Sequence, residues 1–496
     1  MSEKLRKLGF HTGIRQESGL AFRVPQARMI ESGGGGATGG AARATTSLAE
    51  AIAMHGPDIL REEGYTHFCG VDVLYSTPEP YPGYDVRDAN LPPNMRIQLF
   101  PLPRNPDGSI PQYDDMVDMY TENKALMAAT EADLRAMTES GPTFSLGHFW
   151  VDLAVRKHII DRLGLEIPGY ASFHSALALQ IKAENPRAYE DLVASGNLSA
   201  KRQQLEQILF GSNVTLFSTE AERRMSIDAY TGKSVNGRPL QRQDLENNTL
   251  VVPLTIDSDL YSPENPDEPN RKRIEQRREH LAKYGITDDD FVIGGVLRLD
   301  DEKGYDEFAR AFMEYLARFK PTSSSDKAPK LYFSGGVPNK PGMPEKYAAL
   351  MAQVAIFEAE FPQYAGHVVI PNDALDHKLI ANASDWVVGP SKTETFHLVP
   401  KEANAAGVPV ALTRIAAHLA THGENAPYFD LFQADGTINY ASIWNMIDLM
   451  RDPQQTEMYR QLGIENSRRF SKRAVADTIV KDMLSRYSHM FGPRWT

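Results

Sequence analysis

The chain has 496 residues, which is too long for one ordinary hydrophobic core and predicts two or three domains. Its net charge of −12 argues against a nucleic-acid partner, because phosphate backbones favour an excess of lysine and arginine. Cys69 is the only cysteine, so no internal disulfide can form. There is neither a signal-peptide-like start nor a run of about 20 apolar residues. We therefore expect a cytoplasmic protein without a transmembrane segment.

The first half contains short apolar runs of the kind that form buried parallel strands. These runs are Leu20–Val24, Phe68–Tyr75, Pro142–His148, Gly169–Phe173 and Asn213–Phe217. A glycine-rich segment, residues 31–40, leads into an amphipathic helix that starts near Ala41. A helix is also expected over Val151–Leu163, and Thr219 with Glu222 predicts a capping box for the next one.

The second half alternates strands and helices more clearly. Its expected strands are Phe291–Val296, Lys330–Phe333, His367–Ile370, Trp386–Val388 and Val408–Leu412. Helices are expected over Tyr305–Phe319, over Ala374–Ala383 after the cap Asp373, and from near Pro400 to Gly407. This alternation predicts an α/β fold with doubly wound parallel sheets.

A linker separates the two halves. Asp257–Arg273 is rich in Pro, Asp, Glu and Asn and has no apolar periodicity. We therefore predict an N-terminal Rossmann-like domain over residues 1–256 and a C-terminal one over residues 257–470. The last segment, residues 471–496, contains an expected helix over Lys472–Met490 that is long enough to return to the first domain.

The strongest functional motif is SKTETFHLVPKEANAAGVPV, residues 391–410. Glu394 and Glu402 stand seven residues apart, so both carboxylates can face the carboxyl end of the sheet, where open α/β sheets bind ligands. The amides around His397 and Leu398, at a helix N-terminus, suit a phosphate, and a neighbouring carboxylate suits a ribose diol. Either glutamate alone could equally be explained as stabilising the helix dipole; the whole string is more specific.

A second motif, residues 294–308, places Arg298 at a strand end and Lys303 five residues later. Two cations there can hold a diphosphate, since Lys and Arg pair well with phosphate oxygens. The alternative is that both form surface ion pairs with the acidic residues 300–302.

The first motif resembles the signature of the retaining glycosyltransferases that include sucrose-phosphate synthase and sucrose synthase. The chain keeps that family's pattern at Glu394, Phe396, Leu398, Pro400, Glu402, Ala403 and Gly407, with Thr395 in place of a Pro and His397 in place of a Gly. The resemblance implies that the donor is bound by Arg298, Lys303, Glu394, Phe396, His397, Leu398 and Glu402.

Weaker matches extend the resemblance along the chain. Gly39 and Gly40 resemble a Gly-Gly loop that closes over donor phosphate and acceptor, with Ala41 where the family has a Gln. His174 resembles a histidine near the transferred sugar, and His148 resembles a strand-end histidine beside the acceptor loop. Each match alone is modest, but their order along the chain is that of the family.

The resemblance implies a GT-B fold, in which two Rossmann-like domains face each other across a crevice. It further implies a retaining hexosyltransferase that uses a nucleoside-diphosphate sugar as co-substrate and needs neither a resident cofactor nor a metal. Arg298 and Lys303 would stabilise the leaving diphosphate, Glu402 would hold the ribose, and Glu394 and His174 would orient the transferred sugar.

Two other classes stay open. A non-catalytic protein that binds nucleotide sugars or sugar phosphates on the same fold would account for His397 and Ala41. A nicotinamide-dependent dehydrogenase fits the alternation, but it requires Gly-x-Gly-x-x-Gly after an opening strand, and the glycines at 33–40 follow no convincing strand. The expected partners are small donor and acceptor sugars and no nucleic acid. The nucleotide base, the hexose, the acceptor and a homo-oligomeric state are left open.

Overall fold

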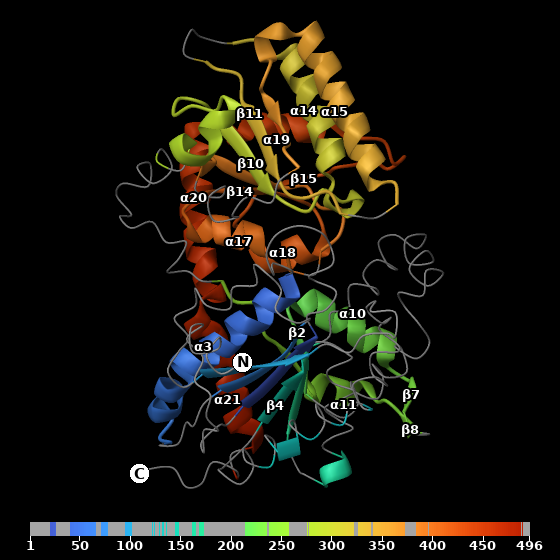
Figure 1. The fold of residues 1–496 in the computed structure, drawn as a ribbon, viewed down its shortest axis with the longest axis vertical. Coiled ribbons are helices and arrows are strands. Elements are labelled where there is room, and N and C mark those ends of the chain that lie inside the picture. The colour runs from blue at the N-terminus through green and yellow to red at the C-terminus, as the bar shows by residue number, and fades with distance from the viewer. Residues whose placement is uncertain are drawn as a thin grey trace. The chain divides into compact units, whose positions relative to one another are not determined.

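The computed structural model describes residues 20–25, 40–65, 71–77, 95–101, 144–147, 161–164, 168–172, 214–235, 238–256, 277–321, 326–338, 341–372, 383–394 and 396–487, and the single residues 122, 124, 128, 131, 132, 135, 275 and 489. The chain divides into two compact units (Figure 1). The first runs to Thr255 and resumes at Lys472, and the second spans Ile256–Ser471.

The described part of the first unit contains a parallel seven-stranded sheet in the order β3-β2-β1-β4-β5-β6-β9. Its strands are β1 (Leu20–Pro25), β2 (Val71–Thr77), β3 (Met95–Pro101), β4 (Phe144–Gly147), β5 (Gly169–Ser172), β6 (Val214–Phe217) and β9 (Thr249–Val251). The strand order reverses at β1, because β2 and β4 lie on either side of it, as in a doubly wound fold. The strand predicted at Leu20–Val24 is therefore confirmed.

The helices of this unit are α3 (Gly40–Glu62), α10 (Glu220–Tyr230), α11 (Arg242–Asn247) and α21 (Lys472–Tyr487), and a short antiparallel pair joins β7 (Ser234–Val235) to β8 (Arg238–Pro239). The C-terminal helix α21 packs against α3, and apolar side chains of both helices, including Ile52 and Ile479, share one core. The hydroxyl of Thr219 accepts the N–H of Glu222 at 3.1 Å, as the cap prediction requires. The carboxylate of Glu222 accepts the N–H and the hydroxyl of Ser218.

The described part of the second unit contains a parallel six-stranded sheet in the order β12-β11-β10-β13-β14-β15. Its strands are β10 (Val292–Val296), β11 (Lys330–Ser334), β12 (Val368–Val369), β13 (Trp386–Gly389), β14 (Val410–Thr413) and β15 (Tyr428–Phe429). The first five confirm the predicted strands, whereas the two-residue β15 was not predicted. Here the order reverses between β10 and β13, which makes that junction the topological switch point.

Helices surround this sheet (Figure 1). They are α14 (Tyr305–Arg318), α15 (Met343–Glu360), α17 (Leu398–Ala405), α18 (Ala416–His422), α19 (Tyr440–Met450) and α20 (Pro453–Ser467), with the short turns η1 (Arg277–Leu281), η2 (Ala282–Tyr284), η3 (Asp301–Lys303), η4 (Pro362–Tyr364) and η5 (Arg468–Phe470). The apolar face of α14 buries Phe308 and Phe312 in the same cluster as Trp386 of β13. Burial of such large side chains stabilises the unit by about 1.5–3 kcal/mol each.

A buried arginine holds the amino ends of β10 and β13 together. Arg277 is 1% exposed and donates to the Asp385 carboxylate at 2.5 Å and to the carbonyl of Ala383 at 2.7 Å. It also donates to the carbonyls of Asp288 and Asp290. The Asp385 carboxylate in turn accepts the N–H of Val292, the first residue of β10, at 2.7 Å. This pair lies at the edge of the sheet opposite the switch-point loops.

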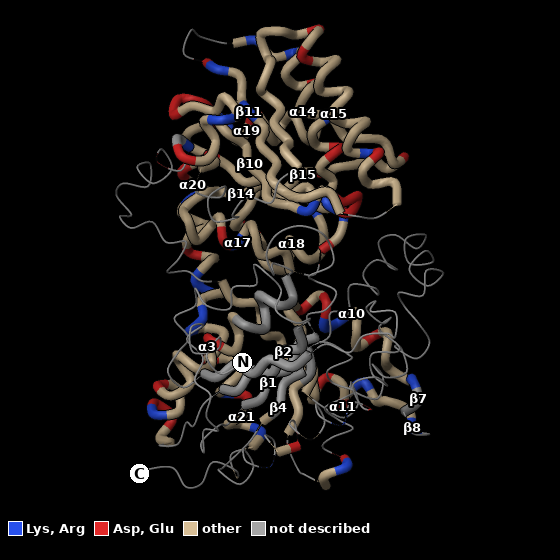
Figure 2. Tube along the Cα trace, viewed as in Figure 1, with Lys and Arg blue, Asp and Glu red and all other residues tan. Residues whose placement is uncertain are grey.

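Acidic and basic residues are interspersed along the described helices of both units (Figure 2). Among the described residues, no helix combines the length and the apolar character that crossing a bilayer requires. The predicted helices over Val151–Leu163 and Ala374–Ala383 and the predicted linker Asp257–Arg273 lie largely outside the described residues.

Candidate active site

The loops that follow β10 and β13 meet at the switch point of the second sheet. The N–H of Lys392, after β13, donates to the carbonyl of Glu302, after β10, at 2.8 Å. Gly304 permits this approach, because a Cβ atom there would stand 2.1 Å from the carbonyl oxygen of Pro390, and its φ of +62° also favours glycine. Open α/β sheets bind their ligands at this position.

Lys303 and Glu394 form an ion pair across these two loops. The Nζ atom of Lys303 lies 2.5 Å from Oε1 of Glu394, and the hydroxyl of Ser391 donates to the same oxygen at 2.9 Å. Burial raises the pKa of the Glu394 carboxyl, but the adjacent Lys303 ammonium outweighs this effect and holds that pKa well below its usual range. The site therefore presents an ionised carboxylate beside a cation.

Arg298 adds a second cation at the end of β10. Its side chain is 48% exposed, and its Nε atom lies 3.2 Å from the Asp300 carboxylate. The sequence left open whether these two cations pair with the acidic residues 300–302 or face a ligand. Arg298 does pair with the neighbouring Asp300, whereas Lys303 pairs across the switch point with Glu394.

Helix α17 begins two residues earlier than a start at Pro400 would give. It starts at Leu398, so Pro400 is its third residue, where the missing N–H is still one of the four without an intrahelical acceptor. Glu402 consequently lies in the second turn and not in the first, and it is buried. Gly407 follows the helix with a φ of +75°, as the predicted helix end requires.

His397 has a left-handed backbone, with a φ of 58°, and among the described residues it is the only non-glycine residue with a positive φ. That conformation costs a residue with a Cβ about 1–2 kcal/mol. Glycine adopts this conformation without that cost, which explains why the related signature has a glycine at this position. The loop therefore needs a compensating interaction here.

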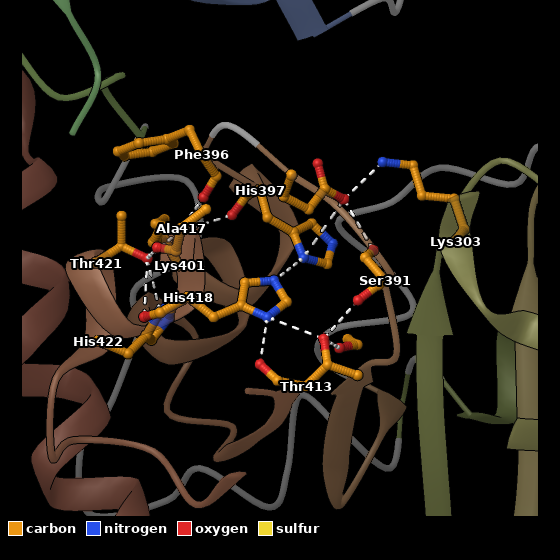
Figure 3. A network of polar contacts seen from close by, with 12 residues as sticks. Lys303, Ser391, Phe396, His397, Lys401, Thr413, Ala417, His418, Thr421 and His422 are labelled. Atoms are coloured by element: carbon orange, nitrogen blue, oxygen red, sulfur yellow. Dashed lines mark hydrogen bonds and ion pairs between the residues drawn. The ribbon is translucent and has the colours of Figure 1, made fainter. Parts of the chain in front are cut away.

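Lys401 supplies that interaction from inside the fold (Figure 3). It is fully buried, and its ammonium donates to the carbonyls of Phe396 and His397, the latter at 2.9 Å, and to the hydroxyl of Thr421 at 3.1 Å. Because a trans peptide points its carbonyl and the next N–H in opposite directions, the N–H groups of His397 and Leu398 face away from Lys401. These are the two amides that the sequence suggested for a phosphate.

Two stacked histidines adjoin the Glu394 carboxylate. Nδ1 of His397 lies 2.9 Å from Nε2 of His418, and 3.8 Å from Oε1 of Glu394. The ring centroids of the two histidines are 5.2 Å apart. The sequence did not single out Lys401, Thr421 or His418. Lys401 lies in the helix predicted from near Pro400 to Gly407, whereas no helix was predicted over α18, which carries His418 and Thr421.

Not all predicted site residues belong to the described part of this site. His174, His148, Gly39 and Thr395 are outside the described residues, so their roles stay predictions. Gly40 is the first residue of α3 in the first unit. In the described part of the chain, no group of three or more His, Cys, Asp or Glu side chains is arranged to hold a metal ion.

Part of the second unit matches a known protein family. Residues 290–442 match the family described as Glycosyl transferases group 1. Over 268 residues the chain is 24% identical to a D-inositol 3-phosphate glycosyltransferase of Corynebacterium aurimucosum, a match that spans 54% of this chain and 54% of that relative. The chain thus spans about half the length of this curated relative.

Two solved structures resemble most of the chain. Sucrose-phosphate synthase from Thermosynechococcus elongatus superposes with a TM-score of 0.64 at 17% identity, covering 95% of this chain and 100% of that one. Anabaena HepE in complex with UDP and glucose gives a TM-score of 0.60 at 16% identity, covering 94% and 100%. The chain therefore has the GT-B fold, and residues 290–442 form a glycosyl transferases group 1 domain, as the motifs predicted.

Proposed function

We propose that the chain transfers a hexosyl group from a nucleoside-diphosphate sugar to a hydroxyl of a small sugar or sugar phosphate, with retention of configuration and without a divalent metal. One observation carries the proposal: the pairing of Lys303 with Glu394 where the strand order reverses. This places a cation suited to a phosphate beside a carboxylate suited to sugar hydroxyls, in a glycosyl transferases group 1 domain.

The leaving diphosphate gains negative charge as its bond to the sugar breaks. Lys303, Arg298 and the amides of His397 and Leu398 supply positive charge and hydrogen-bond donors to stabilise it. Lys303 carries three N–H donors, so it can bond a phosphate oxygen while keeping Glu394. In this proposal the cations provide the charge that a metal would otherwise provide.

The transfer itself needs no carboxylate nucleophile. The anomeric carbon loses its bond to the diphosphate oxygen and gains a bond to the acceptor oxygen on the same face, while the acceptor proton passes to the leaving phosphate. Glu394 orients the hexosyl group, and Glu402 binds the ribose of the donor. Such a step rests on electrostatic stabilisation of the departing charge more than on acid–base catalysis.

The substrate class draws on the names of the similar proteins. HepE was solved with UDP and glucose, which makes UDP-glucose the first donor to test. One relative is named for D-inositol 3-phosphate and another for sucrose phosphate, which favours a phosphorylated acceptor or product. GDP- and ADP-linked hexoses are the other donors to include.

A thermal-shift screen followed by a turnover assay tests the proposal. A nucleoside diphosphate at about 100 times its Kd should stabilise the protein by about 2.7 kcal/mol, because it binds only the folded state. The matching sugar donor should then turn over with hexose phosphates, D-inositol 3-phosphate or free sugars, at a rate that excess EDTA leaves unchanged.

Each part of the proposal has its own contrary result. Loss of turnover with EDTA, restored by manganese or magnesium, would show that the charge assignment to Lys303 and Arg298 is wrong. Donor binding without turnover on any acceptor would instead favour a non-catalytic nucleotide-sugar-binding protein.

A further inference from the structure

The imidazole of His397 stands where the related signature has no side chain, directly beside the Glu394 carboxylate. Its ring packs against the backbone of Gly389 at the end of β13, where an added Cβ would lie 2.9 Å from the ring carbon Cε1. His418 stacks on the ring as well. The ring is therefore held in one place by glycine backbone and by a second imidazole.

The hydrogen bonds of this pair fix which nitrogen atoms carry protons. Nδ1 of His418 lies 2.9 Å from the carbonyl oxygen of Thr413, and because a carbonyl only accepts, this nitrogen carries the hydrogen. Burial lowers the pKa of His418 to about 4 and lowers that of His397 well below its usual value, so both rings are neutral at pH 7. Nε2 of His418 then accepts the N–H of His397 Nδ1.

Because Nδ1 of the neutral His397 ring carries the hydrogen, Nε2 of His397 is a hydrogen-bond acceptor. None of the described residues bonds this nitrogen, and in Figure 3 it faces the side of the site where Lys303 lies. The Glu394 carboxylate also has one oxygen that no described residue bonds. Lys303 and Ser391 both donate to Oε1, and no described residue donates to Oε2. The site thus presents two acceptors on neighbouring side chains, and a ligand that meets both must carry two donors.

We propose that His397 is a donor-sugar-binding residue, which together with Glu394 accepts hydrogen bonds from two hydroxyl groups of the transferred hexosyl group, and that His418 is the residue that positions it. This inference rests on the proposed function and extends it with a contact to the donor sugar that a glycine cannot make.

Calorimetry on the full chain can separate the sugar from the nucleotide. The probes are the tightest-binding of UDP-glucose, UDP-galactose, GDP-mannose and ADP-glucose, and the matching nucleoside diphosphate without its sugar. In His397→Gly the backbone keeps its left-handed conformation without strain, so the fold is retained. We expect about tenfold weaker binding of the nucleotide sugar and unchanged binding of the nucleoside diphosphate, since one hydrogen bond to the sugar is lost.

His418 provides the test of positioning. His418→Gln keeps an oxygen that can accept the His397 N–H, whereas His418→Leu removes the acceptor. We expect His418→Leu to raise the KM for the nucleotide sugar several-fold with kcat nearly unchanged, and His418→Gln to restore much of the loss. The double variant His397→Gly/His418→Leu should bind the nucleotide sugar no more weakly than His397→Gly alone.

The results of these binding measurements distinguish a failure of this inference from a failure of the proposed function. Unchanged or tighter nucleotide-sugar binding by His397→Gly, with normal binding of the nucleoside diphosphate, would overturn this inference alone. An equal loss for the sugar-free nucleotide would also overturn it, because the effect would then lie in the loop and not in the sugar contact. If no nucleoside diphosphate binds the wild-type protein, the proposed function fails and takes this inference with it.

Discussion

Lys303→Ala is expected to lower kcat by about 10²–10³-fold, which is the effect of removing one donor aimed at developing negative charge. Lys303 is the cation that pairs with Glu394 at the switch point, and its side chain is only 19% exposed, so little water screens its charge. Steady-state kinetics with the best donor and acceptor measure the effect. Lys346→Ala is the matched control, because Lys346 pairs with Asp301 on the same loop but is half exposed.

The same variant should also lose stability, because Glu394 would be left buried without its cation. We expect a cost of about 3 kcal/mol or more, as for other broken buried pairs. Adding Glu394→Gln should restore much of this stability, since the uncompensated charge is removed, but it should not restore turnover. Recovery of turnover in the double variant would show that Lys303 acts only by neutralising Glu394.

Arg277→Ala is expected to lower the free energy of unfolding by about 3–5 kcal/mol, because it leaves the Asp385 carboxylate and several carbonyls without their buried partner. Denaturant unfolding of the variant measures this loss. Arg224→Ala is the control, since Arg224 is 75% exposed and its ion pair with Glu220, at 2.8 Å, should contribute less than about 1 kcal/mol.

A variant of Arg277 can also separate effects on stability from effects on ligand binding. It lies at the amino ends of β10 and β13, whereas the candidate site lies at their carboxyl ends. The folded fraction of Arg277→Ala should therefore bind a nucleoside diphosphate with unchanged Kd. A large loss of affinity in fully folded protein would contradict this separation of the two edges.

Five of the six described strands of the second sheet could be predicted, and β10, β13 and β14 are buried on both faces, as the apolar runs of parallel strands require. The family resemblance assigned Lys303 and Glu394 to one donor site, and the structure brings them together because the loops after the adjacent parallel strands β10 and β13 share one edge. The exact start of α17 could not be predicted, because proline is tolerated at any of the first helical positions, and the structure puts Pro400 at the third.

The interior of the site could not be predicted from local patterns. Lys401 lies in a helix whose sequence does not reveal burial; its acceptor Thr421 lies on α18, and the Phe470 ring, 5.7 Å away, comes from η5. His418 is recognisable only from its contacts with Thr413 and His397. Apart from the contact between Thr413 and His418, these contacts join residues 20 to 69 positions apart, which no short-range periodicity encodes.

The most direct test of the proposed activity is the configuration of the product. The wild-type protein is incubated with the α-configured nucleoside-diphosphate hexose that binds best and with each candidate acceptor, and the anomeric proton of the product is followed by NMR. For a retaining transferase we expect acceptor-dependent release of nucleoside diphosphate and a new α-linkage. A β-linked product would contradict retention, and no release with any pair of donor and acceptor would contradict the proposed activity.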